Sequence, residues 1–195
     1  MKKILLATSN SHKTQEIQTM LGSEYLVEDL SSMPQIGDII EDADTFEGNA
    51  NIKALAVSAH TEAFVLADDS GLCVDALDGA PGIYSARYAG PHADMEENKE
   101  LLLENLKNTS EREAAFVCVL SIAQGGEIVT NFRGECTGTI IQEERGAGGF
   151  GYDPLFIPTG YDQTFAELPA QTKNELSHRA HAMAQFQAWL ADHHA

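Results

Sequence analysis

Two adjacent glycines, Gly125 and Gly126, separate the two longest β-like stretches of the chain. Residues 113–123 before them alternate in polarity and are rich in Phe, Val and Ile, and residues 127–141 follow the glycines. A two-residue glycine turn between such stretches is typical of a β-hairpin. The chain therefore has to build a sheet around one long hairpin, and its other segments must extend or cover that sheet.

The segments around the hairpin alternate between strand and helix patterns. Apolar runs predict strands at residues 2–7, 24–28, 63–67 and 72–77. Three- and four-residue spacing of apolar side chains predicts helices at residues 11–21, 45–60, 94–108 and 174–193. This order predicts an α/β fold with a mixed β-sheet and flanking helices. The length of 195 residues suits a single domain over residues 1–195.

The charge balance excludes one class of partner. The chain has 30 acidic against 12 basic residues and a formal net charge of -18. Binding to a polynucleotide needs a basic stripe that neutralises phosphates, and the sequence contains none, so we expect no polynucleotide partner. A small anionic substrate remains compatible if a few lysines, arginines and a metal ion are concentrated locally.

Cysteine usage and hydropathy together predict a cytoplasmic location and no membrane partner. The three cysteines, Cys73, Cys118 and Cys136, are widely spaced and form no CxxC pair, which fits a reducing compartment. The apolar run near the start ends at Thr8, so it is too short for a signal peptide. No other run approaches the length of a membrane span.

The first candidate site joins the first strand to the first helix. Its residues are Thr8, Ser9, Asn10, Ser11, His12 and Lys13. Backbone N–H groups at a helix N-terminus, with the helix dipole, suit a phosphate group, and the hydroxyls and Lys13 add donors and charge. The alternative is an ordinary capped helix, which is the commoner outcome for such a segment on its own.

The second candidate is the acidic pair Asp68 and Asp69, followed by Ser70 and Gly71, where the strand of residues 63–67 is expected to end. Carboxylates at a strand end lie where α/β proteins place ligands. Carboxylates also bind Mg²⁺, which bridges substrate phosphates, and one of them can deprotonate an attacking water. A simple turn is an equally good interpretation, because Asp, Ser and Gly all favour turns.

The third candidate combines Glu41 with Lys53. Lys53 falls on the apolar face of the helix predicted over residues 45–60, so it must either snorkel to solvent or serve a buried anion. Glu41 lies in an acidic segment that is predicted to be a loop, where a solvated charge is the simpler expectation.

The fourth candidate is the glycine-rich segment that contains Phe150, Gly151, Tyr152 and Asp153. Its glycines allow close approach of the backbone to a ligand. The two aromatic rings are suited to stacking on a base, and Asp153 is suited to accepting from ring N–H groups. The alternative is a tight turn whose aromatic residues belong to the core.

The last candidate lies at the start of the C-terminal helix. Lys173 and Arg179 are suited to contact phosphates or a purine carbonyl, and Ser177 is suited to cap the helix beside His178. Exposed helix charges are the more frequent outcome for such residues.

Taken in order, these motifs resemble the Ham1-like inosine/xanthosine triphosphate pyrophosphatase family along nearly the whole chain. The matching segments are LLATSNSHK, DTFEGNANIKA, LADDSGLCVDALDGAPGIYSARYAG, GGFGYDPLF and LSHR. The resemblance implies an elongated mixed sheet, two α/β lobes around a central active-site cleft, and a homodimer. It also implies Mg²⁺-dependent hydrolysis of the deaminated purine nucleotides ITP, dITP and XTP to the monophosphate and pyrophosphate.

The resemblance also assigns roles by position. It implies that Glu41 and Asp69 bind the metal with Asp68 close by, and that Asp69 accepts the proton of the attacking water. It implies phosphate contacts for Lys53 and a triphosphate-binding loop ending at Lys13. The substrate-contacting positions that it implies are Ser70, Phe150, Gly151, Tyr152, Asp153, Lys173, His178 and Arg179.

One departure from the family pattern bears on the helix of residues 45–60. Gly48 stands where Glu is frequent, and a glycine inside a helix costs about 1 kcal/mol relative to alanine. Two other functions remain open on sequence grounds. One is a related Maf-type pyrophosphatase that acts on other modified nucleotides, and the other is a non-catalytic nucleotide-binding module.

Overall fold

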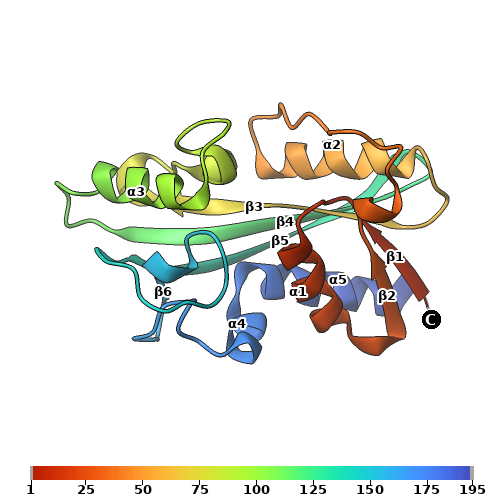
Figure 1. Cartoon of the computed structure of the whole chain (residues 1–195). Coiled ribbons are helices and arrows are strands. Elements are labelled where there is room, and N and C mark those ends of the chain that lie inside the picture. The colour runs from red at the N-terminus through yellow and green to blue at the C-terminus, as the bar shows by residue number, and fades with distance from the viewer. Residues whose placement is uncertain (1, 194–195) are drawn as a thin grey trace. The chain divides into compact units, whose positions relative to one another are not determined.

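The long hairpin predicted from the glycine pair is present in the computed structural model, which describes residues 2–193. Its strands are β4 (Glu113–Gln124) and β5 (Glu127–Ile140), which are neighbours in the sheet (Figure 1). Gly125 and Gly126 have φ angles of 57° and 82°. Left-handed backbone at both central residues matches the twist of the flanking strands, and glycine adopts it without strain.

The sheet has six strands in the order β2-β1-β3-β4-β5-β6. The other strands are β1 (Lys2–Leu6), β2 (Tyr25–Glu28), β3 (Val65–Val74) and β6 (Phe156–Pro158). β1 pairs in parallel with β2 and with β3, whereas β5 and β6 are antiparallel. The predicted mixed α/β sheet is therefore confirmed.

The helices agree with the predicted ones except at the C-terminus. They are α1 (Ser11–Leu21), α2 (Phe46–Ser58), α3 (Met95–Asn105), α4 (Ala170–Leu176) and α5 (His178–His193). Short 3₁₀ helices lie at Gly22–Glu24, Leu30–Ser32, Asp75–Leu77, Gly82–Arg87 and Asp153–Leu155. Within residues 2–193, no helix is long and apolar enough to cross a membrane.

The chain divides into two compact units. The first comprises Met1–Asp69, Cys118–Gly134 and Arg179–Ala195, and the second comprises Ser70–Val117 and Glu135–His178. Strands β3, β4 and β5 each begin in one unit and end in the other.

In the first unit, helices cover both faces of the strands. Figure 1 shows α2 on one face of β1 and β3, and α1 and α5 on the opposite face. Successive strand residues point to opposite faces. Ile4 and Leu6 of β1 accordingly belong to the core cluster that contains α1 and α5 residues, and Leu5 belongs to the cluster that contains α2 residues.

The second unit has one core, formed by α3 and the remaining parts of the strands. Leu72 and Val74 of β3, Leu102 of α3 and the rings of Phe116 and Phe156 are buried in it. Phe116 and Phe156 pack edge to face, with ring centroids 4.8 Å apart, a favoured arrangement of aromatic pairs.

The observed elements differ from the predicted ones at three places. First, residues 63–67 and 72–77 are not separate strands, because β3 runs without interruption through Asp68 and Asp69. Second, the C-terminal helix is broken at Ser177, whose ψ of 160° is extended and separates α4 from α5. Third, β6 is absent from the prediction, since three residues are too few to show a pattern.

Candidate active site

Asp68 and Asp69 lie inside β3, and the alternation of the strand sends their side chains to opposite faces. Leu66 shares a core cluster with α1 and α5 residues, and Ala67 shares one with α2 residues. Continuing with period two, Asp68 points to the face of α1 and α5, and Asp69 points to the face of α2. The ion pairs of the two carboxylates agree with this assignment, since Asp68 pairs with Lys13 and Arg179 whereas Asp69 pairs with Lys53.

Asp68 is buried in a cluster of charges on the α1 and α5 face. Its side chain has no exposed surface, and Arg179 Nε donates to Asp68 Oδ2 at 2.8 Å. Lys13 on α1 forms an ion pair with the other oxygen, Oδ1. Arg179 Nη1 also donates to Glu16 Oε2 at 2.6 Å. Asp68 therefore links α1 to the first turn of α5.

The charges around Asp68 outweigh the effect of burial. Burial by itself raises the pKa of Asp68, but Arg179 and Lys13 hold it well below the ordinary value. Burial likewise tends to lower the pKa of Arg179, and the negative charge of Asp68 reverses that effect and raises it. Both groups are thus held in their charged forms.

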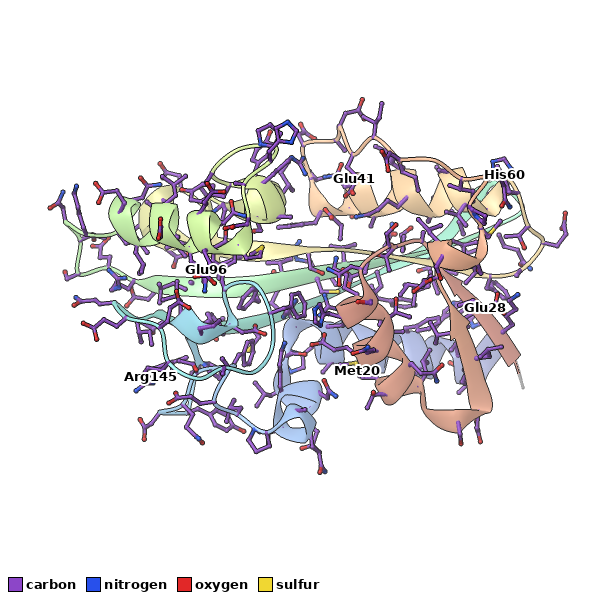
Figure 2. The ribbon with its side chains drawn as sticks, viewed as in Figure 1. Met20, Glu28, Glu41, His60, Glu96 and Arg145 are labelled. Atoms are coloured by element: carbon purple, nitrogen blue, oxygen red, sulfur yellow. The ribbon has the colours of Figure 1, made fainter. Side chains whose placement is uncertain are left out.

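Asp69 belongs to a smaller group on the α2 face. Lys53 Nζ lies 2.9 Å from Asp69 Oδ1 and 2.5 Å from Glu41 Oε2, so one ammonium bridges two carboxylates. Glu41 comes from the irregular segment that leads into α2 (Figure 2). Lys53 is 8% exposed and contacts the buried Asp69 and the half-buried Glu41, which decides between the two predicted outcomes: Lys53 serves a buried anion.

Burial affects the pKa values of this pair in opposite ways. Burial is the largest influence on Asp69 and raises its pKa above the ordinary value, because the nearby Lys53 charge offsets only part of it. Burial alone lowers the pKa of Lys53, but the charges of Asp69 and Glu41 outweigh it and the net shift is upward. Lys53 is therefore a permanent cation at neutral pH.

The donor set around Lys53 fits a magnesium ion. Asp69 Oδ2 is buried and has no hydrogen-bond partner within residues 2–193, and such an atom needs a ligand or a water. Mg²⁺ keeps several waters and takes one or two carboxylates together with substrate phosphates. In the same residues no three His, Cys, Asp or Glu side chains are grouped to hold a metal by themselves, so the fit depends on phosphate oxygens as well.

In the segment before α1, side chains of the segment itself accept hydrogen bonds from the backbone amides at the start of the helix. Asn10 Oδ1 accepts from the amides of His12 and Lys13 at 3.0 and 3.3 Å, and Thr8 Oγ1 accepts from the amide of Asn10 at 3.2 Å. Ser9 and Ser11 are exposed. An anion at this position would therefore meet two hydroxyl groups, the helix dipole and the charge of Lys13 rather than a full set of open amides.

A third acid–base cluster lies around Asp153, in the second unit. Lys173 Nζ donates to Asp153 Oδ2 at 2.7 Å, and the amide of Phe150 donates to the same oxygen at 2.8 Å. Lys173 Nζ also lies 4.8 Å from the centre of the Phe150 ring, within range of a cation–π interaction. Gly149 has a φ of 70°, and a Cβ there would collide with the Asp153 carboxylate, so the cluster requires glycine at this position.

The loop that carries this cluster is held to its own unit at several points. Lys99 on α3 is 4% exposed, and its Nζ lies 2.5 Å from Glu144 Oε2 and 2.8 Å from Glu96 Oε1. Arg145 Nη2 donates to the carbonyl of Asp162 at 2.8 Å. Figure 2 labels Glu96 on α3 and Arg145 in the loop after β5.

Other predicted site residues of this unit belong to its interior. Tyr152 is 2% exposed, and its hydroxyl donates to the carbonyl of Ser85 at 2.9 Å. Burial raises the pKa of the Tyr152 hydroxyl. The His178 ring stacks on Phe116 with centroids 4.9 Å apart. Ser70 is half-buried on β3, directly after Asp69.

The structure thus brings the predicted residues together in three groups, two in the first unit and one in the second. In the first unit Lys13, Asp68 and Arg179 meet on one face of β3, and Glu41, Lys53 and Asp69 meet on the other. In the second unit Phe150, Asp153 and Lys173 meet. The sequence reasoning missed Glu16, although its spacing of three from Lys13 places both on one helix face.

Comparisons of sequence agree with the motifs. The model of the Ham1 family matches residues 4–189. The chain is 45% identical over 193 residues to the dITP/XTP pyrophosphatase of Halalkalibacterium halodurans, covering 97% of this chain and 100% of the relative. It is 45% identical over 195 residues to the dITP/XTP pyrophosphatase of Listeria monocytogenes, covering 98% and 96%.

Solved structures agree as well. The Ham1 protein of Staphylococcus aureus superposes with a TM-score of 0.88 and 40% identity, covering 98% of this chain and 100% of that one. The HAM1 protein of Coxiella burnetii superposes with a TM-score of 0.89 and 38% identity, again covering 98% and 100%. With sequence motifs, fold and near-complete coverage in agreement, this chain belongs to the Ham1 family.

Proposed function

We propose that this protein is a Mg²⁺-dependent pyrophosphatase that hydrolyses the deaminated purine nucleotides dITP, XTP and ITP to the nucleoside monophosphate and pyrophosphate. The observation that carries the proposal is the buried Lys53 between Glu41 and Asp69, together with Asp69 Oδ2, which no group of the described residues 2–193 hydrogen-bonds. The names of the two bacterial relatives, both dITP/XTP pyrophosphatases, support the reaction and the substrate class.

Residues of the first unit are assigned to the triphosphate. Lys13 offers positive charge at the first turn of α1, and Ser9 and Ser11 offer hydroxyl donors. Lys53 adds a second, permanently charged ammonium. These groups neutralise charge that develops on the leaving pyrophosphate, so catalysis rests on positioning and electrostatics.

Two carboxylates are assigned to the metal. Glu41 and Asp69 would hold it, and a bound Mg²⁺ would supply charge neutralisation across the phosphates. Asp68 was expected beside them, but its carboxylate contacts Arg179 and Lys13 on the other face of β3. We therefore assign to Asp68 the positioning of these two cations.

Asp69 is assigned the proton transfer. Asp69 Oδ2 has no hydrogen-bond partner within residues 2–193, so it is open to accept the proton of an attacking water. The ammonium of Lys53 on Asp69 Oδ1 fixes the carboxylate and leaves Oδ2 for the water. The water loses its proton to Asp69 as its oxygen bonds to the α-phosphorus, and the bond to the β-phosphate oxygen breaks.

Residues of the second unit are assigned to the base. Hypoxanthine and xanthine share a 6-keto oxygen and an N1–H group. Lys173 is a donor suited to the keto oxygen, Asp153 is an acceptor suited to N1–H, and the ring of Phe150 is suited to stacking. Adenine lacks both the keto oxygen and the N1 proton, so ATP would leave these polar groups unpaired.

Pyrophosphate release tests the function. The panel would contain ITP, dITP, XTP, GTP, ATP and modified pyrimidine triphosphates, each assayed with Mg²⁺ and with EDTA. We expect metal-dependent release confined to ITP, dITP and XTP. Release from pyrimidines alone would assign the protein to Maf-type chemistry, and binding of ITP without release from any nucleotide would identify a non-catalytic nucleotide-binding module.

A homodimer and a cytoplasmic location are proposed on the same family basis. The three cysteines are all in the thiol form, in keeping with a reducing compartment. Sedimentation velocity of the purified protein tests the dimer, and a sedimentation coefficient of a monomer at micromolar concentration would exclude it.

A further inference from the structure

The segment that carries Glu41 has no helix or strand of its own. Residues 33–45 contain turns and irregular backbone only, from the end of the 3₁₀ helix at Leu30–Ser32 to the start of α2. A side chain on such a segment has no regular hydrogen-bond ladder to fix it. Its carboxylate nevertheless lies 2.5 Å from Lys53 Nζ, so other contacts must hold the backbone near Glu41.

One of these contacts comes from the first turn of α2. The amide of Ala43 donates to Asn49 Oδ1 at 3.0 Å. Asn49 is 1% exposed, although asparagine is usually an exposed residue. A buried side chain that bonds the backbone six residues before it holds the segment against the helix. Ala43 is only two residues from Glu41, so fixing the one confines the other to within roughly 7 Å.

The other contact is the close approach of Ala43 to Gly48, which is possible because glycine has no side chain. A Cβ at Gly48 would lie 2.6 Å from Ala43 Cβ and 3.1 Å from Thr45 Oγ1. Alanine has no rotamer by which its methyl group can avoid such a clash, so the backbone at Ala43 would have to move. Glycine in the first turn of α2 therefore permits the close approach on which the Ala43–Asn49 bond depends.

This arrangement accounts for the departure of Gly48 from the common family residue. Helix propensity alone disfavours glycine within α2, since alanine is the better helix former. Thr45 already caps the helix, accepting from the Gly48 amide at 3.0 Å. The low helix propensity of Gly48 is thus offset by the close packing of Ala43 on α2, which a larger residue at position 48 would prevent.

We propose that Gly48 and Asn49 are positioning residues for the metal site: together they seat Ala43 on α2 and so place the Glu41 carboxylate beside Asp69. The inference rests on the proposed function of Glu41 as a metal ligand. It extends that function by naming two residues that touch neither substrate nor metal and act through the backbone of the segment.

The test compares Gly48→Ala and Asn49→Ala with a matched control, Asn51→Ala. Asn51 lies on the same helix and accepts from Ser121 Oγ at 2.7 Å, so its loss also removes one partly buried hydrogen bond. Three quantities are measured: Mn²⁺ binding to the nucleotide-free protein by electron paramagnetic resonance, exchange of the Ala43 amide by NMR, and the Mg²⁺ concentration for half-maximal pyrophosphate release from dITP.

In Gly48→Ala and Asn49→Ala we expect Mn²⁺ affinity to fall, and the half-saturating Mg²⁺ concentration to rise, by roughly 10–100-fold. The turnover number at saturating Mg²⁺ should stay close to that of the wild type. The Ala43 amide should exchange faster in Asn49→Ala, and Asn51→Ala should match the wild type throughout. In the double variant Ala43→Gly with Gly48→Ala, the clashing methyl group is gone and most of the metal affinity should return.

Glu41→Gln separates the two ways in which the proposal can fail. If Glu41→Gln weakens Mn²⁺ binding but Gly48→Ala and Asn49→Ala bind it like the wild type, the positioning inference is overturned and the metal role of Glu41 stands. If Glu41→Gln also binds Mn²⁺ like the wild type, Glu41 is no metal ligand and both proposals fall. Equal weakening in Asn51→Ala would show a general effect on the helix and overturn the inference.

Discussion

Asp68 and Asp69 are consecutive residues of one strand, yet they occupy opposite electrostatic surroundings. Asp68 has no exposed side-chain surface and is bound by Arg179 and Lys13. Asp69 shares one lysine with Glu41, and its buried oxygen Oδ2 has no hydrogen-bond partner among residues 2–193. The pKa shifts are opposite as well, downward for Asp68 and upward for Asp69.

The difference between Asp68 and Asp69 shows how two consecutive residues of one strand can serve different roles, one in stability and one in the proposed chemistry. Period-two alternation places one carboxylate against α1 and α5, where satisfied charges hold elements together. The other carboxylate faces α2, where an unsatisfied oxygen is available for chemistry. Adjacent acids in a sequence therefore need not share a site, and a DD pair inside a strand is better treated as two separate positions.

Removing the carboxylate of Asp69 should have the largest effect on activity. We expect Asp69→Asn to reduce the turnover number by roughly 10²–10⁴-fold, the usual contribution of a general base. Its melting temperature should change little, because burial raises the pKa of Asp69, so its charged form adds no stability to the fold, and Lys53 keeps Glu41 as an anionic partner. Turnover from dITP and thermal unfolding are measured together, and near-normal turnover would remove Asp69 from the reaction.

The same change at Asp68 should act mainly on stability. Asp68→Asn leaves the buried Arg179 without its main anionic partner, and breaking a buried ion pair costs about 3–5 kcal/mol. For a chain of this length that corresponds to a fall in melting temperature of roughly 6–20 °C. Calorimetry measures the melting temperature. If Asp68→Asn were as stable as Asp69→Asn, the two faces of β3 would not differ in their contribution to stability.

A third carboxylate, Asp153, sharpens the comparison because it is also paired with a buried lysine. The Asp153→Asn variant should still hydrolyse nucleotides but discriminate less between purine bases, because the substitution alters the acceptor proposed for the N1–H of the base. We expect the ratio of kcat/KM for dITP over dATP to fall by roughly 10–100-fold, the value of one charge-assisted hydrogen bond. An unchanged ratio, together with an unchanged melting temperature, would assign base selection to other residues.

The smallest predicted effect is a dependence on pH of the stability that the Asp68 carboxylate contributes. The folded pKa of Asp68 lies below its unfolded value, so its contribution is present above about pH 4 and is lost as the pH falls through the folded pKa. The stability gap between wild type and Asp68→Asn should therefore narrow on acidification below pH 4. Urea unfolding between pH 3 and pH 7 measures it, and a gap independent of pH would contradict the ion-pair account.

The sequence predicts most of the fold because its strongest patterns are local. The helix predicted over residues 11–21 has the observed bounds, and the hairpin follows from Gly125 and Gly126. The errors arise where tertiary structure overrides local preference. Turn-forming residues at Asp68–Gly71 remain in β3, because neighbouring strands and buried cations stabilise an extended backbone there.

The site is predictable in composition but not in arrangement. A lysine on the apolar face of a helix leaves two outcomes open, snorkelling to solvent or contact with a buried anion, and Lys53 contacts the buried Asp69 and the half-buried Glu41. Nothing in the pattern indicates that Glu41 reaches it, since an irregular segment has no period from which to predict direction. The pairing of Asp68 with Arg179 joins residues 111 positions apart, a contact that spacing cannot reveal.

Hydrolysis of dITP in H₂¹⁸O tests most directly whether a water attacks the α-phosphorus, which is the central step of the proposed reaction. Mass spectrometry of the products locates the label. We predict ¹⁸O in the nucleoside monophosphate and none in the pyrophosphate after a single turnover. Label in the pyrophosphate, or release of orthophosphate in its place, would show attack at another phosphorus and contradict the assigned chemistry.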